Sequence, residues 1–182
     1  MDTYFNLESY IQSRMADAIA KHGLVLGKGN GGLATLSNAH VVAEFENIDN
    51  NYVRFNFFQP AQPEIKFEFA EFLDACFDER SKELRPLPPK EWENERQLNF
   101  MLDNYNSLIL EGYFSKPISG DYSWLQKYLD LKEENDRLSK ARANLRRANH
   151  PEAKAIFAKR MDGDPTWKDD VKRILAEQNS KS

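Results

Sequence analysis

Cysteine and histidine are scarce in this sequence of 182 residues, and their scarcity limits the chemistry that its side chains offer. There is one cysteine, Cys76, and there are three histidines, His22, His40 and His150. A single cysteine excludes an intramolecular disulfide and a metal site built from several cysteines, and its apolar surroundings, FLDACF, predict a buried thiol. The histidines show neither the H-x-x-x-H nor the H-E-x-x-H spacing of metal-binding helices. We therefore expect no metal site.

Sequence motifs for nucleophilic or nucleotide chemistry are also missing. Neither Ser37 nor Ser119 lies in a Gly-x-Ser-x-Gly turn, and Cys76 has no neighbouring histidine or basic residue that would activate it. The glycine-rich stretch around Lys28 differs from a phosphate-binding P-loop, because this lysine precedes most of the glycines and β-like sequence follows. We therefore expect a protein that is not an enzyme and that binds no cofactor.

Long hydrophobic runs are the third absence. No stretch approaches 18 consecutive apolar residues, and the N-terminal sequence shows no basic segment followed by an apolar run of signal-peptide length. Together with the single cysteine, this predicts a cytoplasmic protein without a membrane partner. The apolar fraction of 41% is that of a globular protein, and the length suffices for a sizeable core.

The spacing of the apolar residues predicts an α+β fold. A helical period covers residues 3–22, with Gly23 expected to end that helix, and a longer helical stripe covers residues 92–114. Between them, residues 33–58 show the two-residue period of a short antiparallel β-meander. We expect the meander to pack against the long helix, and residues 137–182 to form a helical extension whose inward residues include Ile156, Phe157 and Met161.

Details of the sheet follow from the same period. Val53, Phe55 and Phe57 share one face of the third expected strand and form the natural bed for the long helix. Pro60 and Pro63 are expected to end the sheet, because proline donates no ladder hydrogen bond. The run that follows is expected to begin as an edge strand and then to become helical, and the glycine-rich stretch before the meander is expected to be a mobile loop.

Charge is distributed unevenly along the chain. Residues 1–136 carry 13 Lys/Arg and 23 Asp/Glu, whereas residues 137–160 carry 8 Lys/Arg and 1 Asp/Glu. This contrast divides the chain into an acidic body, residues 1–136, and a basic helical extension, residues 137–182, which we expect to pack on the body. An acidic body suits a basic partner and disfavours nucleic acid, although a merely solubilising surface explains the same charge.

Two groups of charged residues are candidates for contact with a partner. In the body the candidates are carboxylates on the predicted strands, turns and helix: Glu44, Glu46, Asp49, Asp74, Asp78 and Glu79. In the extension, Arg142, Arg146 and Arg147 have a spacing that places them along one side of a helix, where they could contact phosphates. Each group also has a structural explanation, a solvated sheet face for the first and pairing with the acidic body for the second.

The order of elements resembles a family of small bacterial proteins. An N-terminal amphipathic helix, a meander ending in VRFNFF, the run EFAEFLDACF, a long helix and the stretch LILEGYFSKPISGDYSWLQKYL are together similar to immunity proteins of polymorphic or contact-dependent inhibition toxin systems. The resemblance covers about residues 1–130 and carries no diagnostic motif. It implies a cytoplasmic inhibitor that binds a basic toxin domain. The alternative is a nucleic-acid-binding or regulatory accessory protein that uses the basic helices.

Overall fold

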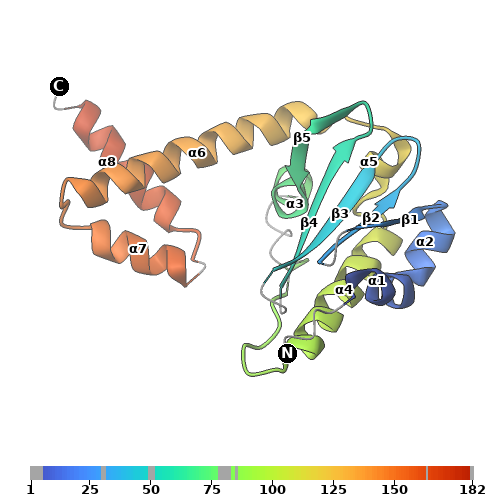
Figure 1. Cartoon of the computed structure of the whole chain (residues 1–182). Helices are drawn as coiled ribbons and strands as arrows, with labels where there is room; N and C mark the ends of the chain where they lie inside the picture. Colours follow the sequence, from blue (N-terminus) through green and yellow to red (C-terminus); the bar gives the residue numbers. More distant parts are fainter. Residues whose placement is uncertain are drawn as a thin grey trace. The chain divides into compact units, whose positions relative to one another are not determined.

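The two-residue period between Leu33 and Phe58 builds the centre of a five-stranded antiparallel sheet, as the computed structural model shows (Figure 1). The structure describes residues 6–29, 32–48, 52–77, 83–84, 86–162 and 164–180. The strands follow one another in chain order across the sheet: β1 Val25–Lys28, β2 Leu33–Ser37, β3 Val42–Ile48, β4 Tyr52–Gln59 and β5 Gln62–Glu68. The expected α+β class and the three expected strands of the meander, β2 to β4, are confirmed.

Two expectations about the edges of the sheet are wrong. Part of the glycine-rich stretch that was expected to be a loop forms β1, where a Cβ on Gly27 would lie only 2.4 Å from the Thr35 hydroxyl oxygen of β2. Glycine thus permits this close pairing and does not prevent it. At the other edge Pro63 lies inside β5, because an edge strand tolerates a residue that donates no hydrogen bond and the β4–β5 register shifts between Phe57 and Gln59.

One face of the sheet carries the core of the first part of the chain. Its inward residues include Phe45, Phe55 and Phe57, all of them buried. The ring of Phe55 lies 4.3 Å from that of Phe69 and 5.3 Å from that of Tyr105, as measured between centroids. These two partners come from α3 and α4, and the helices that precede the tail are α1 Leu7–Arg14, α2 Ala16–His22, α3 Phe69–Phe77, α4 Asn94–Leu110 and α5 Ser115–Ser119. The expected packing of a helix on Val53, Phe55 and Phe57 is therefore confirmed, since Tyr105 also donates a 2.9 Å hydrogen bond to the Val53 carbonyl.

Glycines in the left-handed region end three of these helices, α2, α4 and α5, the last at Gly120 (φ 77°). Gly23 (φ 58°) ends α2 as expected, and the next N–H bonds back to the Ile19 carbonyl at 3.0 Å. Gly112 (φ 93°) ends the helix expected over 92–114 in the same way, so that α4 is shorter than expected. The helix expected over 3–22 is interrupted at Met15, whose side chain is fully buried between α1 and α2.

The chain divides into two compact units, Met1–Tyr128 and Leu129–Ser182, which we call unit 1 and unit 2. The division falls within the longest helix, α6 Leu125–Arg147, and this helix continues without a break past Asp136, where the sequence-based boundary was drawn. Unit 2 contains the rest of α6 with α7 Ala153–Met161 and α8 Trp167–Asn179. Its buried core consists of Leu138, Leu145, Ile156, Trp167, Val171 and Ile174.

Three side chains lie nearer the surface than the sequence predicted. Phe157 and Met161 of α7 were expected to point inward, but they are 39% and 65% exposed. Because α7 has only nine residues, a single position, Ile156, is buried, and its neighbour Phe157 is turned about 100° away from it. Cys76 is half-buried and not fully enclosed.

Candidate functional site

The face of the sheet opposite the aromatic core is a first candidate surface. We call it the open sheet face, because no described residue on it is buried. The cross-strand register places Glu44 beside Asn56, Glu46 beside Arg54, and Val42 beside Phe58. Charged and apolar side chains therefore alternate across β3 and β4, which is a composition suited to contact with another protein.

Both predicted carboxylates of this face are held by cations on other strands, Glu46 by one on the adjacent β4 and Glu44 by one on β5 beyond it. Glu44 accepts a hydrogen bond from the Lys66 ammonium group at 2.6 Å, and Glu46 accepts one from the Arg54 guanidinium at 3.1 Å. The Glu44 carboxylate is the less accessible of the two, since only 13% of its side chain is exposed. The two predicted residues thus share one face of the sheet, within a pattern of alternating charge.

The remaining predicted carboxylates do not join them in one described cluster. Asp74 lies on α3, partly buried, while Asp49, Asp78 and Glu79 lie outside the described residues. On the same helix, Glu71 accepts a 2.7 Å hydrogen bond from the buried Tyr128 hydroxyl. Burial, followed by this bond to a carboxylate, raises the pKa of Tyr128 well above its ordinary value, so that the hydroxyl stays protonated.

A hollow of about 400 Å³ in unit 1 has four of its five charged lining residues in local contacts. Arg14 binds Asp103 at 3.3 Å, and Glu95 accepts a 2.6 Å hydrogen bond from Tyr10. The guanidinium of Arg96 stacks 3.8 Å from the centre of the Trp92 ring. Glu93 forms no ion pair with a described residue, and the buried Asn99 Oδ1 accepts no hydrogen bond from one.

The arginines predicted in the tail are brought together in unit 2. Arg142, Arg146 and Arg147 line one shallow hollow at the end of α6, and we call this group the arginine cluster. The guanidinium of Arg142 lies 5.9 Å from the Trp167 ring centre, and that of Arg146 lies 5.5 Å from the Phe157 ring centre. Two of the three cations are therefore held against aromatic rings.

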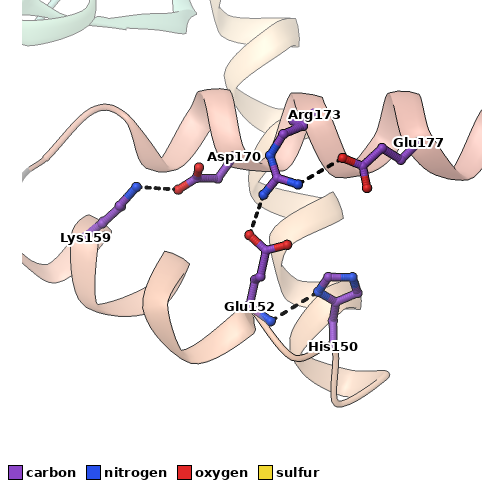
Figure 2. Close-up of polar contacts among 6 residues, drawn as sticks. All are labelled: His150, Glu152, Lys159, Asp170, Arg173 and Glu177. Atoms are coloured by element: carbon purple, nitrogen blue, oxygen red, sulfur yellow. Dashed lines mark hydrogen bonds and ion pairs between the residues drawn. The ribbon is translucent and has the colours of Figure 1, made fainter.

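Within the described part of unit 2, none of the three arginines forms an ion pair, whereas cations nearby do. Figure 2 shows Lys159 bound to Asp170 at 2.6 Å, and Arg173 bound to both Glu152 and Glu177. The pairs of Lys159 with Asp170 and of Arg173 with Glu152 join the α7 region to α8. Four carboxylates of unit 2 are thus engaged by cations outside the arginine cluster: Glu134, Glu152, Asp170 and Glu177.

The electrostatic state of Arg142 reflects this lack of partners. Its Nε–H is buried and donates no hydrogen bond to any described residue. Desolvation, followed by repulsion from Arg160 and Arg146, lowers the pKa of its guanidinium below the ordinary value. An anion placed in the hollow would relieve both effects.

A second, larger hollow adjoins the arginine cluster through Arg146. It measures about 700 Å³ and is lined by the turn after α6 and by the first turns of α7, with Asn149, His150, Lys154 and Phe157 among its residues. The turn is a Schellman motif, because Asn149 adopts φ 50° and the His150 N–H bonds back to the Leu145 carbonyl at 2.9 Å. His150 Nδ1 then accepts the Glu152 N–H at 3.3 Å, so its other ring nitrogen carries the proton (Figure 2).

Sequence reasoning missed the residues that α7 adds to this surface. Phe157 was expected in the core, and Lys154 and His150 were not singled out for contact with a ligand. The available signal was the sequence Asn149-His150-Pro151, which marks a sharp turn and returns α7 towards the end of α6.

Comparisons with protein-family models, with curated proteins and with solved structures gave no match to this chain. Among the described residues, no group of three or more His, Cys, Asp or Glu side chains could hold a metal ion. In the same residues no helix is long and apolar enough to cross a membrane. The candidates are therefore the open sheet face and the arginine cluster with its adjoining hollow.

Proposed function

We propose that this chain is a non-catalytic inhibitor that binds a basic protein partner through unit 1, in the manner of a cytoplasmic immunity protein acting on a toxin domain. The observation that carries the proposal is the open sheet face. Helices cover one side of the five-stranded sheet, and the other presents Val42, Ile48 and Phe58 beside the Glu44 and Glu46 carboxylates. Such a mixture supplies apolar contact area together with charges that select the partner.

The charge of unit 1 supports a basic partner. Residues 1–128 contain 19 Asp/Glu and 12 Lys/Arg, a net charge of −7, whereas residues 129–182 contain 10 and 13, a net charge of +3. A long-range negative potential raises the rate at which a positively charged domain associates. The edge strand β5 adds Glu64 and Glu68 to the acidic residues of unit 1, with Lys66 as the one cation among residues 62–68.

The ion pairs on the open sheet face bear on how a partner would bind. A basic side chain that approaches Glu44 or Glu46 competes with Lys66 or Arg54, both of which are partly exposed. The exposed pair of Arg54 with Glu46 contributes at most about 1 kcal/mol, so exchanging its cation for another costs little. These carboxylates can therefore contribute to recognition although they are paired in the free protein.

The test is co-expression of the tagged protein with the product of the neighbouring reading frame, followed by purification and measurement of association kinetics. We expect a basic domain to co-purify in equal amount and to lose its toxicity to the host. Reversing both charges, Glu44→Lys with Glu46→Lys, should lower the association rate at low salt by about tenfold and flatten its dependence on salt.

Two control variants separate recognition from charge and from folding. Glu91→Lys with Glu111→Lys changes the net charge equally at exposed positions outside the sheet, and it should have a smaller effect. Exchanging partners, with Glu44→Lys and Lys66→Glu together, keeps both the pair and the net charge, and it should still slow association. Equal rates for all variants would remove the open sheet face from the interface.

A further inference from the structure

Unit 2 carries a surface that the proposed function does not use. Two sets of its cations differ in their contacts. Lys159, Lys172 and Arg173 lie within 4 Å of carboxylates, whereas the arginine cluster has no such partner among the described residues. Ion pairs with a described residue are also absent for Arg137, Lys140, Lys154 and Arg160. Since like charges repel, an unneutralised group of arginines around a partly desolvated guanidinium is unfavourable in the free protein. Its cost is offset if an anion binds there.

A purely structural role explains only part of this arrangement. Arg146 and Arg147 lie in the last turn of α6, where cations interact favourably with the helix dipole. Arg142 lies more than one turn earlier, and its buried Nε–H gains nothing from the free carbonyl groups at the helix end. The contact of Arg142 with Trp167 likewise leaves its Nε–H without an acceptor.

The adjoining hollow has a different chemical character. Phe157 and Pro151 provide an exposed ring and an apolar wall, while Asn149 and His150 provide hydrogen-bonding groups. Because His150 Nδ1 accepts the Glu152 N–H, its protonated nitrogen is left to donate to a ligand. The hollow of about 700 Å³ is within the usual size of a small-molecule site, and it shares Arg146 with the arginine cluster.

We propose that unit 2 binds a nucleoside phosphate, either free or as part of a single-stranded nucleic acid, with the phosphate at Arg142, Arg146 and Arg147 and the base in the hollow beside Phe157. Guanidinium groups bind phosphate oxygens through two parallel N–H donors, and an exposed aromatic ring stacks on any base. The proposal is independent of the inhibitor function, because none of these residues belongs to unit 1.

The test uses the full chain and a fluorescent oligothymidylate of about 12 nucleotides, with anisotropy measured across a salt series. We expect a Kd in the micromolar range at low salt, with log K falling against log salt by about 0.7 for each phosphate neutralised. Replacing the cluster by Arg142→Gln, Arg146→Gln and Arg147→Gln should weaken binding at least tenfold and reduce the magnitude of the slope by about 2.

Two further variants make the result specific. Lys90→Gln, Lys132→Gln and Lys172→Gln remove the same charge at exposed positions outside the cluster, and binding should stay within about twofold of the wild type. Phe157→Leu keeps an apolar side chain but removes the ring, and it should weaken single-strand binding by about fivefold while leaving heparin binding unchanged.

Competition distinguishes the two sources of the ligand. Displacement of the oligonucleotide by AMP but not by inorganic phosphate would indicate that the ligand is a free nucleotide. Displacement only by a second oligonucleotide would indicate that the ligand is a nucleic-acid strand. Either result supports the proposal. Equal displacement by heparin, together with no effect of Phe157→Leu, would reduce the surface to a general polyanion contact and overturn it. Unchanged affinity in the arginine variant, or no binding at low salt, would also overturn it.

Discussion

The two units of this chain differ in amino-acid composition. Of its 22 aromatic residues, 20 fall within residues 1–128 and only Phe157 and Trp167 fall within residues 129–182. Charged residues show the opposite trend, with 31 among the first 128 positions and 23 among the last 54. Unit 1 is therefore expected to depend mainly on buried aromatic area, and unit 2 on a small core supplemented by ion pairs.

The contacts in each unit follow from this difference. In unit 1 the buried rings of Phe55, Phe57 and Phe69 contact one another and the rings of neighbouring helices. In unit 2 six buried residues form the core, and ion pairs join α8 to the other two helices. The arginine cluster lies in the smaller and more highly charged unit.

The largest expected effect tests the aromatic core. Replacing Phe57 by alanine removes a fully buried ring that contacts Phe67, Phe72, Phe114 and Trp124. We expect the free energy of unfolding to fall by about 3–5 kcal/mol, because the cavity cannot close among rigid rings. Urea denaturation followed by tryptophan fluorescence measures this loss. Phe157→Ala, at an exposed ring, is the matched control and should cost less than about 1 kcal/mol; equal losses would contradict the comparison.

A smaller but more localised effect is expected in unit 2. Ile156 is the one buried residue of α7, so Ile156→Ala should cost about 2–4 kcal/mol. Because the core has only six members, this loss should release the amide protons of α7 and α8 to exchange while those of β3 and β4 stay protected. Hydrogen exchange followed by mass spectrometry measures the protection of both regions in one sample. Loss of protection in β3 and β4 to the same extent would show that the chain unfolds as one cooperative unit.

The sequence predicted the parts of the fold that depend on local periodicity. The alternation around Phe55 defined the meander and its buried face, and Gly23 marked a helix end, because both signals operate over a few residues. The strand β1 was missed, because its glycine-rich composition favours a loop until pairing with Thr35 is known. Pro63 was misjudged for a related reason: only the position of β5 at the edge of the sheet makes proline acceptable there.

The candidate surfaces were predictable to a similar degree. Helical spacing placed Arg142, Arg146 and Arg147 along one side, and the structure brings them into one hollow. The sequence did not predict that Phe157 lines the adjoining hollow, because its position depends on how α7 folds back in three dimensions. Likewise, the alternation of β3 put Glu44 and Glu46 on one face, but their pairing with Lys66 and Arg54 depends on the register of three strands.

The smallest expected effect tests whether ion pairs contribute to the stability of unit 2. Glu134 of α6 binds Lys172 of α8 at 2.7 Å, and this hydrogen bond is the main reason that the pKa of the Glu134 carboxyl lies below its ordinary value of 4.5. The unfolded chain therefore takes up a proton more readily than the folded one. Stability from the pair is fully present above about pH 4.5 and is lost as the pH falls through the folded-state pKa.

Glu134→Gln should accordingly destabilise the protein at neutral pH and have no effect once the carboxyl is protonated in both states. Both side chains are more than one third exposed, so solvent screening limits the effect to about 0.5 kcal/mol. Thermal unfolding at pH 7 and near pH 3, with Glu133→Gln as an exposed neighbour for control, measures the difference. High salt should reduce it at pH 7 for the same reason. A penalty that did not shrink between pH 7 and pH 3 would have to arise from lost packing of the side chain, and the role assigned here to charge in unit 2 would then be wrong.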